Sequence, residues 1–93
     1  MSDKVIAVTG SSRGIGASIA LELGRRGHVV GCLSRGGGLP EGTPPDGRFL
    51  PFACDVTIES SVTEALAGLA QAAGGLHGLV NNAGIYAEYD SAT

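Results

Sequence analysis

Three glycines near the N-terminus have the spacing of a phosphate-binding turn. They lie in the stretch TGSSRGIG at residues 9–16, which follows an apolar run and leads into a helical pattern. A helix N-terminus offers unpaired N–H groups and the positive end of the helix dipole, and glycine lets a phosphate approach the backbone closely. The spacing is G-x-x-x-G-x-G and not the G-x-G-x-x-G of the common dinucleotide fingerprint. The stretch therefore predicts a phosphate site of a less common type.

Two further polar stretches stand directly after apolar runs. One begins at Asp55, and the other is the sequence NNAG at residues 81–84. The carboxyl ends of parallel strands meet at the same edge of a sheet, where ligands bind. We therefore expect both stretches to lie beside the glycine turn.

Short apolar runs alternate with helical patterns along the chain. Residues 5–8, 28–33, 49–54 and 76–80 are typical of buried strands, and residues 14–26 and 57–73 are typical of helices. Pro51 cannot donate to a strand ladder, which places the third strand at an edge of the sheet. Thr57 is the expected N-cap of the second helix.

This order predicts an α/β fold, a Rossmann-like parallel sheet with flanking helices and the strand order 3-2-1-4. Residues 34–47 hold five glycines and three prolines, so we expect a long surface loop there with at most one short helical turn. Residues 1–93 are interpreted as one partial dinucleotide-binding domain, truncated after its fourth strand. The fourth strand would then leave an open edge, which favours self-association.

Composition and charge narrow the classes of partner. A net charge of −3 argues against nucleic acid, and the basic pair Arg25-Arg26 falls where it would compensate a helix dipole. No run is long enough for a membrane span and no signal-peptide pattern is present, so we expect no membrane partner and a cytoplasmic protein. Cys32 and Cys54 lie inside apolar runs, as buried free thiols do.

Together the three motifs resemble the short-chain dehydrogenase/reductase family, over residues 4 to about 85. The resemblance implies an oxidoreductase that transfers hydride between a nicotinamide dinucleotide and a small carbonyl or alcohol. It implies that the glycine turn holds the cofactor pyrophosphate and that Asp55 hydrogen-bonds the adenine amino group, with the Val56 amide beside it. It also implies that residues 81–84 brace the sheet and approach the ribose next to the nicotinamide.

The end of the second strand indicates NADP(H), with NAD(H) as the less favoured cofactor. An acidic residue there would bind both ribose hydroxyls and repel a 2′-phosphate, but the chain has Ser34 and Arg35. The forked guanidinium of Arg35 can pair with a phosphate, and Arg13 is expected to reach the same group. The expected cofactor-binding residues are Gly10, Ser12, Arg13, Gly14, Ile15, Gly16, Ser34, Arg35, Asp55, Val56, Asn81, Ala83 and Gly84.

The catalytic Tyr-x-x-x-Lys of that family is not found in the chain. The only lysine is Lys4, and the residues four positions after Tyr86 and Tyr89 are Asp90 and Thr93. A neighbouring lysine lowers the pKa of a catalytic tyrosine, whereas an aspartate raises it. We therefore expect no catalytic residue and no metal site here, an inactive chain in isolation, and a substrate that binds only in a full-length parent.

Two other functions stay open on the sequence alone. The chain could serve as a non-catalytic nucleotide-binding module as it stands. Alternatively, the sequence GSSRG at residues 10–14 satisfies the G-x-S-x-G of α/β-hydrolases, with Ser12 as the nucleophile. Asp55 and His77 then follow in the chain order of that fold, although His77 is more readily interpreted as a solvated loop residue.

Overall fold

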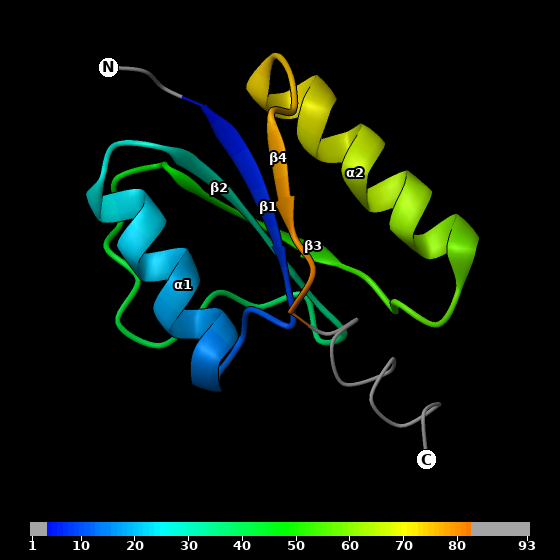
Figure 1. Cartoon of the computed structure of the whole chain (residues 1–93), viewed down its shortest axis with the longest axis horizontal. Helices are drawn as coiled ribbons and strands as arrows, with labels where there is room; N and C mark the ends of the chain where they lie inside the picture. Colours follow the sequence, from blue (N-terminus) through cyan, green and yellow to red (C-terminus); the bar gives the residue numbers. More distant parts are fainter. Residues whose placement is uncertain (1–3, 83–93) are drawn as a thin grey trace.

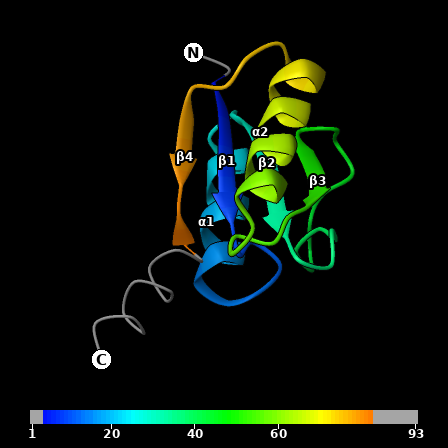
Figure 2. The ribbon, with the colours of Figure 1, turned by 90° about the vertical axis from the view of Figure 1, so that its right-hand side faces the viewer.

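The described part of the computed structural model, residues 4–82, contains four strands and two helices (Figure 1). The elements are β1 (Val5–Thr9), α1 (Gly14–Arg25), β2 (Val29–Ser34), β3 (Phe49–Ala53), α2 (Glu59–Ala73) and β4 (Gly78–Val80). Their order is the predicted one. The two helices lie on opposite faces of the sheet, with α2 in front of the strands and α1 behind them in Figure 2.

All strand pairs are parallel, and the sheet has the order β3-β2-β1-β4 that the sequence predicts. In the centre of the sheet, Ala7 of β1 lies between Gly31 of β2 and Leu79 of β4. Pro51 lies on the edge strand β3, opposite Cys32 of β2, as its missing N–H requires. The carboxyl ends of β1, β2 and β3 consequently meet at one end of the molecule.

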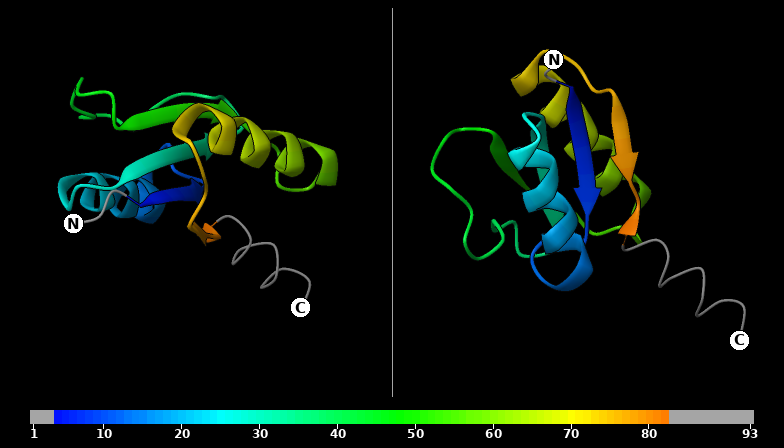
Figure 3. Two further views of the ribbon diagram at one scale, coloured as in Figure 1. Left: turned by 90° about the horizontal axis from the view of Figure 1, so that it is seen from above. Right: turned by 60° about the vertical axis from the view of Figure 1, so that its left-hand side comes forward.

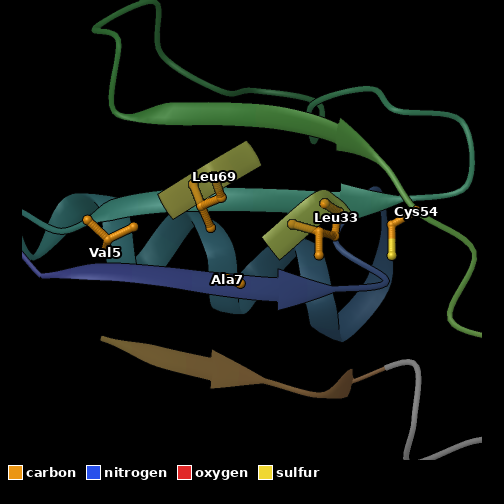
Figure 4. Close-up of a cluster of buried hydrophobic side chains, with 6 residues drawn as sticks. Val5, Ala7, Leu33, Cys54 and Leu69 are labelled. Carbon is orange, nitrogen blue, oxygen red and sulfur yellow. The ribbon is translucent and has the colours of Figure 1, made fainter. Parts of the chain in front are cut away.

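Each face of the sheet has its own apolar cluster. Leu69 of α2 is fully buried over β2, where Gly31 leaves the space that the leucine occupies (Figure 4). On the opposite face, the absence of a side chain at Gly24 of α1 leaves room for the ring of Phe49. A Cβ at Gly31 would lie 2.3 Å from a methyl group of Leu69, so these close approaches fix the distance of each helix from the sheet.

The first helix ends as the sequence predicts. Gly27 follows it with a φ of 94°, and Arg25 and Arg26 both pair with Glu22, at 3.2 and 2.9 Å. A long loop then takes the place of a helix between β2 and β3 and runs alongside α1 (Figure 3). The loop contains turns but no turn of helix. At its end, the side chain of Arg48 donates a hydrogen bond to the Gly27 carbonyl oxygen at 2.9 Å.

The predicted N-cap of the second helix is wrong by one residue. The helix begins at Glu59 with Ile58 as its N-cap, and Ile58 provides no side-chain cap. Thr57 precedes this N-cap, and its hydroxyl donates to the carboxylate of Asp55. Gly74 ends the helix with a φ of 85°, as expected.

The fourth strand is shorter than the sequence predicts and begins at Gly78. Cys32 and Cys54 are both buried and free, in agreement with the sequence. No helix within residues 4–82 is long and apolar enough to cross a bilayer. The same residues hold no cluster of side chains suited to a metal ion.

Candidate functional site: a cleft at the carboxyl ends of the strands

A cleft of about 960 Å³ opens where the first three strands end. It collects four stretches that are far apart in the chain: the glycine turn, the end of β2, the start of the β3–α2 connection and Asn82 after β4. Its walls are formed by Gly10, Ser12, Arg13, Gly14, Ile15, Ser34, Arg35, Gly36, Cys54, Asp55, Val56, Thr57 and Asn82. The sequence thus predicts most of the described walls of the cleft, while Gly16 and Asn81 are not among them.

The N-terminus of α1 faces this cleft, and no acidic side chain of the helix's first turn neutralises its positive end. Arg13 is the N-cap residue, with extended backbone and no side-chain cap hydrogen bond, and the first turn contains no acidic residue. Gly10 and Gly14 adopt φ values of 63° and 67°, which glycine accepts readily. The turn therefore presents the positive end of a twelve-residue helix to any anion in the cleft.

Gly16 lies behind the turn and not in the cleft. A Cβ at this position would be 2.0 Å from the carbonyl oxygen of Gly10, so only glycine lets α1 approach the end of β1 this closely. Asn82 secures the same carbonyl, since its Nδ2 donates to the Gly10 oxygen at 3.3 Å. The third glycine of the motif and the side-chain amide of Asn82 thus both hold the turn in place at Gly10.

Asn82 was not among the expected site residues, although it lines the cleft. The asparagine pair at residues 81 and 82 indicates a polar site in the sequence, but the sequence alone does not show which of the two asparagines faces the cleft. Asn81 lies outside it, in an adjoining groove, where it accepts a hydrogen bond from the Thr9 hydroxyl at 3.2 Å. Ala83 and Gly84 lie outside the described residues.

The end of β2 places a buried serine beside an exposed arginine. The Oγ of Ser34 accepts a hydrogen bond from the Gly37 N–H at 3.2 Å, which closes a tight turn around Arg35 and Gly36. Ser11 joins this strand to the glycine turn, because its N–H donates to the Leu33 carbonyl at 3.3 Å. Arg35 and the glycine turn therefore border the same space.

Asp55 is held in a network of hydrogen bonds at the end of β3. Its Oδ1 accepts from the hydroxyl of Thr57 at 2.6 Å and from the Thr57 N–H at 3.0 Å, and its own N–H donates to the Ser61 hydroxyl at 2.9 Å. The hydrogen bonds from Thr57 lower the pKa of Asp55, and the nearby charge of Arg35 lowers it further. The carboxylate is therefore ionised at neutral pH.

The hydrolase arrangement is not present. His77 lies at the amino end of the sheet, where its Nδ1 accepts a hydrogen bond from the Val5 N–H at 2.9 Å. Ser12 and Asp55 line the cleft at the other end of β1, a strand of five residues that spans about 16 Å. His77 therefore cannot act as a base for Ser12, and it is a partner of β1 and not a simple loop residue.

Comparison with known proteins shows which family this chain resembles. The family model described as short chain dehydrogenase matches residues 4–93. Farnesol dehydrogenase of Aedes aegypti is 39% identical over 95 residues, which cover 94% of this chain. The 3-oxoacyl-[acyl-carrier-protein] reductase MabA of Mycobacterium tuberculosis is 37% identical over 83 residues, which cover 89% of it.

A solved structure agrees with the sequence comparisons. The aldohexose dehydrogenase AldT of Thermoplasma acidophilum, in ligand-free form, superposes with a TM-score of 0.70 at 34% identity over 86% of this chain. The chain spans only part of each relative: 38% of the farnesol dehydrogenase, 31% of MabA and 29% of AldT. The match thus covers the cleft described above and leaves most of each relative outside it.

Proposed function

This chain belongs to the short-chain dehydrogenase family, and on that premise we propose that its cleft binds the dinucleotide NADP(H). Such a cofactor carries a hydride to or from a small carbonyl or alcohol, so the protein would be part of an oxidoreductase. The observation that supports the proposal best is the composition of the cleft. It combines an uncapped helix N-terminus, two arginines and one carboxylate in a single space.

We propose that the pyrophosphate lies on the N-terminus of α1. The first N–H groups of a helix have no partner within it, and here no side chain caps them. A Cβ on Gly14 would point into open space, so the residue is needed for its positive φ and not to avoid a contact within the protein. The backbone N–H groups of the glycine turn are therefore open to the doubly charged pyrophosphate.

The 2′-phosphate would lie between Arg35 and Arg13. Both side chains are exposed and both line the cleft, from the end of β2 and from the glycine turn. Arginine pairs with phosphate through two parallel hydrogen bonds, which a single ribose hydroxyl cannot offer. Ser34 lines the same cleft, and its Oγ accepts a hydrogen bond from the Gly37 N–H.

Within residues 4–82, the walls of the cleft contain no tyrosine or lysine that could protonate a carbonyl oxygen. The only lysine of the sequence, Lys4, precedes β1 at the end of the sheet away from the cleft. We therefore propose that residues 1–93 alone bind the dinucleotide without catalysis. The two free buried thiols suit a reducing compartment, and we propose the cytoplasm.

Dissociation constants of NADPH and NADH for matched arginine variants test the cofactor assignment. Arg35→Ala should weaken NADPH about tenfold or more and change NADH by less than about twofold, because a hydrogen-bonded charge contact is lost only with NADPH. Arg25→Ala is the control, since Arg25 is also exposed but lies at the far end of α1. Equal weakening of both dinucleotides, or no change in either, would refute the assignment to NADP(H).

A further inference from the structure

Thr57 makes two hydrogen bonds to one oxygen of the Asp55 carboxylate. Its hydroxyl donates to Oδ1 at 2.6 Å, and its backbone N–H donates to the same atom at 3.0 Å. Neither the hydroxyl nor the N–H of Thr57 caps α2, whose N-cap residue is Ile58. The residue that the sequence assigns to helix capping is therefore engaged with the acidic group of the cleft.

The backbone of Asp55 is fixed from the same side. Its N–H donates to the hydroxyl of Ser61 in the first turn of α2, and its carbonyl accepts from the Ile58 N–H at 3.0 Å. Within residues 4–82, no hydrogen bond reaches the second carboxylate oxygen, Oδ2. Asp55 and Thr57 both line the cleft. One oxygen of the carboxylate is thus held by the protein, while the other remains available to a ligand.

We propose that Thr57 is a positioning residue that sets base selectivity: it orients Asp55 so that Oδ2 accepts a hydrogen bond from the amino group of adenine. This inference rests on the proposed function, in which the cleft holds a dinucleotide. A carboxylate only accepts hydrogen bonds, and the exocyclic amino group of adenine donates them. Hypoxanthine has a carbonyl oxygen at that position, so two acceptors would face each other.

The hydroxyl of Thr57 matters because it limits rotation of the carboxylate. The terminal torsion of an aspartate is broad and roughly two-fold, so an unrestrained carboxylate samples many orientations. Thr57 holds Oδ1 from two directions, which leaves Oδ2 in a defined place. Removal of the hydroxyl keeps the charge in the cleft but loses its direction, so affinity for the adenine form should fall while affinity for the hypoxanthine form should not.

The test compares NADPH with its hypoxanthine analogue, in which the adenine amino group is replaced by a carbonyl oxygen. The dissociation constants of both are measured for the purified protein and its variants Thr57→Val, Thr57→Ser and Thr63→Val. Thr57→Val keeps the branched shape and removes the donor, whereas Thr57→Ser keeps the donor. Thr63 is the control, because it is another exposed threonine of the same region.

The wild-type protein should prefer the adenine form by about tenfold, as expected for one hydrogen bond to a charged group. In Thr57→Val this preference should fall to about twofold. Thr57→Ser and Thr63→Val should retain it. A preference that persists in Thr57→Val, or is absent from the wild type, would overturn the inference. Failure to bind either dinucleotide would overturn the proposed function as well.

The pKa of Asp55, followed by carboxyl NMR without ligand, provides a second readout. Thr57→Val should raise this pKa because the largest cause of its lowering is the hydrogen bond from the Thr57 hydroxyl. Thr63→Val should leave it unchanged. Unchanged values in both variants would show that Thr57 does not hold the carboxylate in solution, which overturns the inference independently of cofactor binding.

Discussion

Replacement of Gly16 by alanine should destabilise the protein strongly, although it adds a single methyl group. The new Cβ would lie 2.0 Å from the Gly10 oxygen, 2.8 Å from the Gly10 carbonyl carbon and 2.9 Å from Nδ2 of Asn82. Two of these atoms belong to the backbone and cannot rotate away. Helix α1 must therefore move from the end of β1, or the turn must deform.

The cost follows from two contributions. Overpacking of a filled interior costs about 1–3 kcal/mol. Displacement of the Gly10 carbonyl also breaks its 3.3 Å hydrogen bond with Asn82, which contributes about 1 kcal/mol. The expected loss of unfolding free energy is about 2–4 kcal/mol, a large part of the roughly 5–15 kcal/mol typical of a domain.

Urea unfolding followed by far-ultraviolet circular dichroism measures this loss, and two other glycines are the controls. Gly14→Ala meets no atom within 4 Å but has a φ of 67°, so it should cost about 1–2 kcal/mol. Gly38→Ala has open space and no positive φ, so it should remain within about 0.5 kcal/mol of wild type. A Gly16→Ala variant as stable as Gly38→Ala would refute the close packing of α1 on the turn.

Two further outcomes are expected. Burial raises the pKa of the Cys32 thiol to about 11. An unfolded thiol ionises near pH 8.5, so the unfolded state loses this proton first and the free energy of unfolding should fall between about pH 8.5 and 11. Cys32→Ala should have a shallower decline over that range, and equal slopes would contradict the burial of the thiol. Residues 1–93 alone should bind NADPH without reducing carbonyl compounds, because the only lysine is Lys4; turnover well above the uncatalysed rate would disprove this.

The strand order and the position of the cleft could be predicted from the sequence because each depends on local patterns. A buried parallel strand appears as a short apolar run, and polar residues directly after such runs must gather at one edge of the sheet. The 34–47 loop was equally clear, since its glycines and prolines exclude a helix. These features need no knowledge of which side chains touch.

The contacts that shape the site could not be predicted in the same way. The sequence favours Thr57 as the N-cap of α2, but the helix begins one residue later and the Thr57 hydroxyl donates to Asp55, which only the backbone geometry decides. Asn82 bonds the Gly10 carbonyl across 72 residues, and His77 bonds Val5 across the same separation. Such pairings depend on strand register, which the apolar pattern of β4 does not fix.

A crystal structure of the protein with bound NADPH would test the central proposal most directly. We expect the pyrophosphate within hydrogen-bonding distance of the backbone N–H groups at the start of α1, and the 2′-phosphate beside Arg35. The opposite result would place the dinucleotide elsewhere, for example in the pocket between α1 and the 34–47 loop, which Leu21 and Phe49 line. A 2′-phosphate turned to solvent, with Arg13 and Arg35 both unengaged, would contradict the assignment to NADP(H).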